Sequence, residues 1–82
     1  PEPLFEGRFE IVQQRLVGEK HLKLVLRTEC GSAQFDGIAF NVDREIWPNP
    51  NVQWVDLAYK LEVNEFRGRE TVQLLINHIA TV

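Results

Sequence analysis

The sequence contains one cysteine, two histidines and no methionine in 82 residues. Because Cys30 is the only thiol, the chain can form no internal disulfide and no zinc site built from several thiolates. No apolar run approaches the roughly 20 residues that a membrane span requires, and no secretory or transit segment is visible. These absences predict a cytoplasmic domain from a reducing compartment, with no membrane partner.

The sequence motifs typical of catalytic sites are also absent. The sequence has no glycine-rich phosphate loop, no His-x-Glu or His-Glu-x-x-His metal pattern and no nucleophile elbow. His21 and His78 lie far apart, without a carboxylate at ligand spacing beside either, and we interpret each as satisfied or solvent-facing. Cys30 has no companion motif. The sequence therefore predicts no catalytic residue and no metal ligand in this chain.

Length and charge restrict the remaining functions. Eighty-two residues with 44% hydrophobic and 26% charged side chains are typical of one small globular domain. The formal charge of −3 is unusual for a domain that binds nucleic acid by bulk charge, so any such function must rest on local arrangement. A removed initiator methionine or excision from a longer protein would each explain the start at Pro1. We expect residues 1–7 to be a linker remnant and residues 8–82 to form the domain.

Alternation of apolar and polar residues with a period of two dominates the chain. It predicts four strands, which cover residues 9–16, 21–27, 34–40 and 52–63. In the first strand the alternation slips near Ile11 and Val12, as it does in a bulged strand. In the second strand Leu22, Leu24 and Leu26 share one face, which we expect to be buried.

The second half of the chain contains two less regular features. Gly37 in mid-strand predicts a bend, a bulge or the close approach of other backbone. Residues 41–51, with two prolines, predict a connection that includes at most one helical turn. Residues 69–80 fit either a helix with an apolar stripe or a fifth strand, and the short glycine-containing segment before them favours a hairpin.

Five short strands need closure or cover to protect their edges. A Greek-key barrel provides this closure, and its longest connection would fall between the third and fourth strands, as is common in OB-folds. We therefore predict an all-β, five-stranded OB-fold barrel with a short helical or irregular insert between strands 3 and 4. An SH3-like barrel is the main structural alternative.

The second strand carries the first candidate binding residues. Lys23 and Arg27 lie on its polar face about 13 Å apart, and His21 precedes them on the same side. Domains that hold single-stranded nucleic acid pair positive groups for the phosphates with flat side chains for the bases. The alternative interpretation, that these residues are only the solvated face of an amphipathic strand, has equal weight.

Aromatic residues and a second group of cations add candidates. Tyr59 shares its face with apolar neighbours and is expected in the core, whereas Trp54 shares its face with charged residues and is expected at the surface. Trp47 would either close one end of the barrel or stack on a base, and Phe66 is a further stacking candidate. Two arginines that flank a hairpin glycine, together with a nearby lysine, form a second small basic patch: Arg67, Arg69 and Lys60.

Several blocks of the chain resemble a known family. They are His21-Leu22-Lys23-Leu24, the run from Phe35 to Asn41, Ala58-Tyr59-Lys60-Leu61, and the run from Asn64 to Arg69 followed by Val72-Gln73-Leu74-Leu75-Ile76. In this order they resemble the OB-fold domain of RecJ, a bacterial exonuclease that degrades single-stranded DNA from the 5′ end. The likeness extends from about Phe9 to Ile79, and the block from Asn64 to Ile76 is its most specific part.

The resemblance implies properties that periodicity alone does not. Residues 69–80 should be the fifth strand. The parent enzyme would belong to the DHH phosphoesterases, which use two divalent ions, Mn²⁺ or Mg²⁺, in other domains. The present fragment would then lack nuclease activity and hold single-stranded DNA for those domains during DNA repair and recombination. The predicted DNA-binding residues are His21, Lys23, Arg27, Trp54, Arg67 and Arg69.

Two alternatives remain open. A protein-interaction module could dock the nuclease domains or bind the acidic, hydrophobic tail of a single-stranded DNA-binding protein near the second basic patch. A structural clamp could close the substrate path without binding DNA itself. The acidic balance of the chain predicts that the isolated domain binds DNA weakly, with neighbouring domains supplying part of the positive groove.

Overall fold

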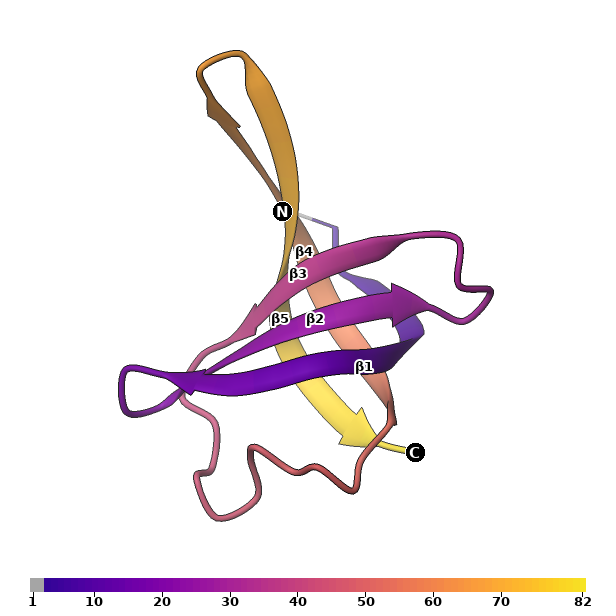
Figure 1. The fold of residues 1–82 in the computed structure, drawn as a ribbon, viewed down its shortest axis with the longest axis vertical. Coiled ribbons are helices and arrows are strands. Elements are labelled where there is room, and N and C mark those ends of the chain that lie inside the picture. The colour runs from indigo at the N-terminus through magenta and orange to yellow at the C-terminus, as the bar shows by residue number, and fades with distance from the viewer. Residues whose placement is uncertain (1–2) are drawn as a thin grey trace.

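The computed structural model describes residues 3–82 as a closed barrel of five strands (Figure 1). The strands are β1 (Phe5–Val17), β2 (His21–Thr28), β3 (Gln34–Ala39), β4 (Trp54–Phe66) and β5 (Arg69–Thr81). Around the barrel they follow the order β1-β2-β3-β5-β4, and β4 closes back onto β1. The predicted all-β barrel is confirmed, and its strand order is consistent with an OB-fold.

β1 pairs with two different strands and thereby closes the barrel. Its first half pairs with β4 and its second half with β2, and the register shifts between Ile11 and Gln13. The bulge predicted from the slipped alternation is therefore confirmed, and it marks the point where β1 bends from one partner to the other. The turn to β2 covers residues 18–20 and begins at Gly18, whose φ of +66° is unfavourable for residues with a side chain.

The leucines of β2 form the centre of the core. Leu22, Leu24 and Leu26 are each completely buried, as the alternation predicted. The other buried apolar residues come from all the remaining strands and the β3–β4 connection: Phe9, Ala39, Trp47, Val55, Leu57, Leu74 and Ile76. Because side chains of a strand alternate between its two faces, burial of these leucines places the side chains between them on the outside of the barrel.

Closure between β3 and β5 depends on Gly37. These two strands run parallel, and Gly37 lies opposite Leu74. A Cβ atom at Gly37 would lie 2.9 Å from Leu26 Cδ1 and 3.2 Å from Ile76 Cδ1, so core side chains occupy the space that any larger residue would need. The close approach at this glycine is made by side chains and not by other backbone as predicted, since the nearest backbone atom, the Leu74 carbonyl oxygen, would lie 3.7 Å from the Cβ atom, an ordinary contact distance.

The β3–β4 connection contains turns and no helix. Trp47 from this segment is 5% exposed and packs with the core, so it closes one end of the barrel and is not available to stack on a base. The Trp47–Pro48 peptide is cis. Gln14 on β1 fixes the connection: its Nε2 donates to the Asn49 carbonyl at 2.7 Å, and its Oε1 accepts from the Asn49 amide at 2.7 Å.

β4 and β5 form a long hairpin whose outer part extends beyond the barrel (Figure 1). The strand interpretation of residues 69–80 is confirmed and the helical one is wrong. The prediction of a half-buried strand through residue 63 is correct only for the first half of β4. Val63 is 60% exposed, because within residues 3–82 the pairing of β4 with β1 ends at Tyr59 and the rest of the hairpin has no neighbouring strand on that edge.

The expected domain boundary between residues 7 and 8 stays a prediction. β1 already begins at Phe5, and its first residues pair with Tyr59, Ala58 and Leu57 on β4. No helix in residues 3–82 is long and apolar enough to cross a membrane. The cytoplasmic location also stays a prediction.

The packing at Gly37 generates the first test. We expect Gly37→Ala to lower the free energy of unfolding by about 1–3 kcal/mol, because the added methyl must displace Leu26 or Ile76 in a closed core. The measurement is urea unfolding followed by tryptophan fluorescence. Gln34→Ala, at an exposed position of the same strand, is the control and should change stability by less than about 0.5 kcal/mol. Equal stability of both variants would contradict this account of barrel closure.

Candidate nucleic-acid interface

The outward face of β1, β2 and β3 brings together two cations from neighbouring strands. Arg15 on β1 lies directly opposite Lys23 on β2, and Lys23 lies opposite Ile38 on β3. Side chains at directly opposed positions have Cβ atoms about 5 Å apart, so two positive charges share one site. Such a pair repels itself in the free protein, and a bound anion would relieve the repulsion.

Neither Arg15 nor Lys23 forms an ion pair with another residue of the described part of the chain. The ion pairs within residues 3–82 are Arg8–Asp56 and Arg27–Glu10, and neither includes them. Asp36 lines the same surface hollow as Arg15 and Lys23. It lies opposite Val25, two residues along the strand from Lys23. The pair can thus approach a phosphate without first breaking an ion pair.

An aromatic group lies beside this cationic pair. The rings of His21 and Phe40 pack edge to face with centroids 5.1 Å apart, and Phe40 is 54% exposed. The Asn41 amide donates to His21 Nδ1 at 3.4 Å, so Nε2 is the nitrogen that carries the proton in the neutral ring. The face therefore offers one exposed flat ring next to two cations, the combination that single-stranded nucleic acids require.

Arg27 is on the predicted face but is already engaged. Its Nε donates to Glu10 Oε1 at 2.9 Å, and Gln53 Nε2 donates to the other Glu10 oxygen at 2.8 Å. The hydrogen bonds from Gln53 and then from Arg27 lower the pKa of Glu10 below its usual range. A phosphate would have to compete with this carboxylate for Arg27, so the guanidinium is a weaker candidate than Lys23.

Trp54, Arg67 and Arg69 lie away from the cationic pair. Trp54 is half-buried on β4 opposite Glu10, so Glu10 separates it from Arg27. Arg67 and Arg69 are exposed at the tip of the β4–β5 hairpin, about 20 Å along the strand from the row of Lys23. Arg67 has a φ of +52° and its guanidinium lies 5.2 Å from the centre of the Phe66 ring. The six predicted residues therefore form no single cluster, and their roles stay predictions.

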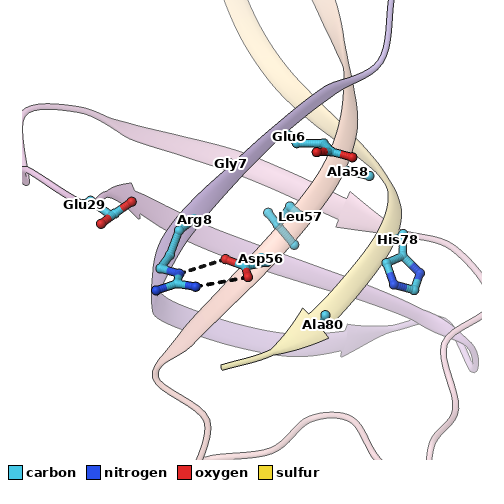
Figure 2. Close-up of a pocket in the computed structure, with 9 residues that line it drawn as sticks. All are labelled: Glu6, Gly7, Arg8, Glu29, Asp56, Leu57, Ala58, His78 and Ala80. Atoms are coloured by element: carbon cyan, nitrogen blue, oxygen red, sulfur yellow. Dashed lines mark hydrogen bonds and ion pairs between the residues drawn. The ribbon is translucent and has the colours of Figure 1, made fainter.

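The outward face of β1, β4 and β5 has the opposite character (Figure 2). A hollow of about 470 Å³ lies over Ala58 and Ala80, with Glu6, Glu29 and Asp56 among its lining residues. Its one guanidinium, that of Arg8, donates to both carboxylate oxygens of Asp56 at 2.8 and 3.2 Å. This bond holds the pKa of Asp56 below its usual range. An excess of carboxylates makes this face unsuitable for a phosphate backbone.

Cys30 is exposed in the β2–β3 turn, and its thiol is more acidic than the sequence indicated. Hydrogen bonding to the hydroxyls of Ser32, at 2.9 Å, and Thr28, at 3.6 Å, lowers the pKa of the thiol to about 7. No group of three or more His, Cys, Asp or Glu residues within residues 3–82 is placed to hold a metal ion.

Sequence reasoning missed Arg15 and Phe40. Both carried a usable signal. Counting outward from the turn at residues 18–20 places Arg15 opposite Lys23. Phe40 is four residues after Asp36 and therefore shares its outward face. Neither signal was decisive without the register of the strands, because the register of a hairpin depends on the type and length of its turn, which the alternation alone does not determine.

Comparison with known proteins identifies the family of the chain. The family model described as RecJ OB domain matches residues 1–78. The single-stranded-DNA-specific exonuclease RecJ of Dickeya dadantii is 60% identical over 79 residues, which cover 96% of this chain and 14% of that protein. The Escherichia coli protein of the same name is 54% identical over the same shares, and that of Haemophilus influenzae is 43% identical over the whole chain and 15% of its own length.

The chain thus spans about one seventh of the length of these relatives. The resemblance inferred from the residues is confirmed, since the matched region includes β1 to β4 and β5 up to His78. The chain belongs to the RecJ OB domain family.

Proposed function

We propose that this domain holds single-stranded DNA on the outward face of β1, β2 and β3, as the accessory domain of a longer 5′-to-3′ exonuclease in DNA repair and recombination. The observation that carries the proposal is the opposed pair of Arg15 and Lys23 beside the exposed ring of Phe40. The relatives are named as exonucleases specific for single-stranded DNA, which supports a ligand with phosphates and unpaired bases.

In this proposal the face acts by position and charge. The guanidinium of Arg15 and the ammonium of Lys23 contact phosphates, while the ring of Phe40 stacks on a base and His21 supports that ring from its edge. Hydrolysis, and the Mn²⁺ or Mg²⁺ ions that would assist it, belong to the rest of the polypeptide. This chain contributes binding of the strand and no chemical step.

Protein interaction is the second candidate function. It is favoured by the net charge of −3 and by the exposed apolar residues of the β4–β5 hairpin. The partners in question are the nuclease part of the same polypeptide and, near Lys60, Arg67 and Arg69, the acidic tail of a single-stranded DNA-binding protein. Binding of a neutral or acidic peptide would depend less steeply on salt than binding of DNA.

The DNA proposal predicts a specific loss when the cationic pair is neutralised. We expect Arg15→Gln combined with Lys23→Gln to weaken binding of a labelled oligo-dT strand about tenfold, or about 1.4 kcal/mol, at low salt. The slope of log affinity against log salt should also become shallower by about 1.4, since each lost phosphate contact removes ~0.7. Fluorescence anisotropy of the 82-residue chain measures both quantities.

Arg8→Gln is the matched control, because it removes one positive charge from the acidic face. It should leave the salt slope unchanged. If the control and the double variant lose affinity equally per charge removed, binding responds to net charge and the proposed face is wrong. If the unaltered chain does not bind at low salt, the interaction function becomes the better conclusion.

Glu10 provides a test in the opposite direction. We expect Glu10→Gln to strengthen DNA binding, because it weakens the hold on Arg27 and removes a negative charge beside it. The folded-state pKa of Glu10 is lowered, so its contribution to stability is present above the ordinary carboxyl pKa and is lost as pH falls through the folded value. The variant should therefore lose less stability than the unaltered chain on acidification.

Anisotropy titrations and thermal unfolding between pH 3 and 6 measure these effects. Glu6→Gln makes the same charge change on the acidic face and is the control. Equal affinity gains in the two variants would show that Arg27 does not reach the DNA.

A further inference from the structure

The β4–β5 hairpin presents an apolar surface with no partner in residues 3–82. Val63 lies opposite Val72, and the next pair toward the barrel on the same face of the hairpin is Leu61 with Leu74. Strand alternation places these side chains on the face that continues the core, yet Leu61 is 49%, Val63 60% and Val72 39% exposed. We call this surface, with Phe5 and Tyr59 at its base and Glu65 and Glu70 at its tip, the arm face.

The start of β1 extends the arm face. Phe5 is opposite Tyr59, their rings stack with centroids 5.9 Å apart, and Phe5 remains 41% exposed. Because Phe5 pairs with Tyr59, the beginning of β1 lies at the base of the projecting hairpin. The apolar surface therefore continues from the barrel rim along the hairpin.

The outer end of the arm face carries two carboxylates, whereas Arg67 and Arg69 lie beyond them in the turn and on the opposite face of the hairpin. Glu65 lies directly opposite Glu70, one pair beyond Val63 and Val72 on the same face. Like charges in direct opposition destabilise a strand pair. A cation from a partner that covers the arm face would remove this repulsion, so the complementary surface is apolar with a lysine or arginine at its edge.

We propose that the arm face docks onto the part of the same polypeptide that the longer relatives have outside the matched residues. The matched region is about 14% of those proteins, so most of the polypeptide is available to cover it. A two-stranded hairpin with an uncovered apolar face is only marginally stable in water, which a docked neighbour would correct. A second copy of the domain fits less well, because its own arm face offers carboxylates and no cation.

This inference rests on the docking function proposed above and does not depend on the DNA face. It is tested by hydrogen exchange of the full-length protein and of the 82-residue chain, both without DNA. We expect the backbone amides of residues 61–65 and 70–73 to exchange at least about tenfold more slowly in the full-length protein. Equal exchange of these amides in both proteins overturns the proposal. So does a concentration-dependent dimer of the 82-residue chain that protects the same amides.

A charge reversal at the tip separates docking from simple stability. In the 82-residue chain, Glu70→Lys places a cation opposite Glu65 and should raise the thermal midpoint. In the full-length protein the same substitution should reduce the protection of residues 61–65, since the partner's cation now faces another cation. Glu62→Lys, on the opposite face of the same hairpin, is the matched control and should leave that protection unchanged. Full protection in the Glu70→Lys protein would overturn the proposed contact.

Discussion

The buried row of leucines on β2 is the constraint on which the rest of the structure depends. Leu22, Leu24 and Leu26 lose all contact with solvent, and a strand cannot bury them without turning the intervening side chains outward. Lys23 therefore lies on the outside of the barrel, where it is half-buried, because its two neighbours on the strand belong to the core. The same constraint explains Gly37, since the space that its side chain would occupy is filled by Leu26.

Segregation of charge reconciles an acidic chain with a DNA-binding proposal. Glu6, Glu29 and Asp56 lie around the hollow over β4 and β5, and Glu65 and Glu70 near the hairpin tip. Arg15 and Lys23 share a hollow on another face with one carboxylate, that of Asp36, which forms no ion pair with them. Net charge sums over all faces, but a phosphate responds mainly to charges within about a Debye length, roughly 10 Å. A formal charge of −3 is therefore compatible with one locally positive surface.

Local patterns were enough to predict most of the fold, because each depends on one strand at a time. Alternation located four strands, and its slip located the bulge in β1. Residues 69–80 were ambiguous, since an apolar stripe at helical spacing arose by chance within a strand. The candidate site was less predictable: the partner of Lys23 is decided by register, and the engagement of Arg27 by Glu10 requires side-chain geometry from two strands.

The outer half of β4 shows where local pattern and observed burial separate. Its alternation continues unchanged through Leu61 and Val63, as if the strand remained half-buried, but the barrel ends before them. Threonine or charged residues in an exposed hairpin would keep the strand conformation at lower risk of aggregation than these valines do. The alternation through Leu61 and Val63 is therefore the one expected if the arm face docks as we propose, since docking would bury the side chains that the barrel leaves exposed.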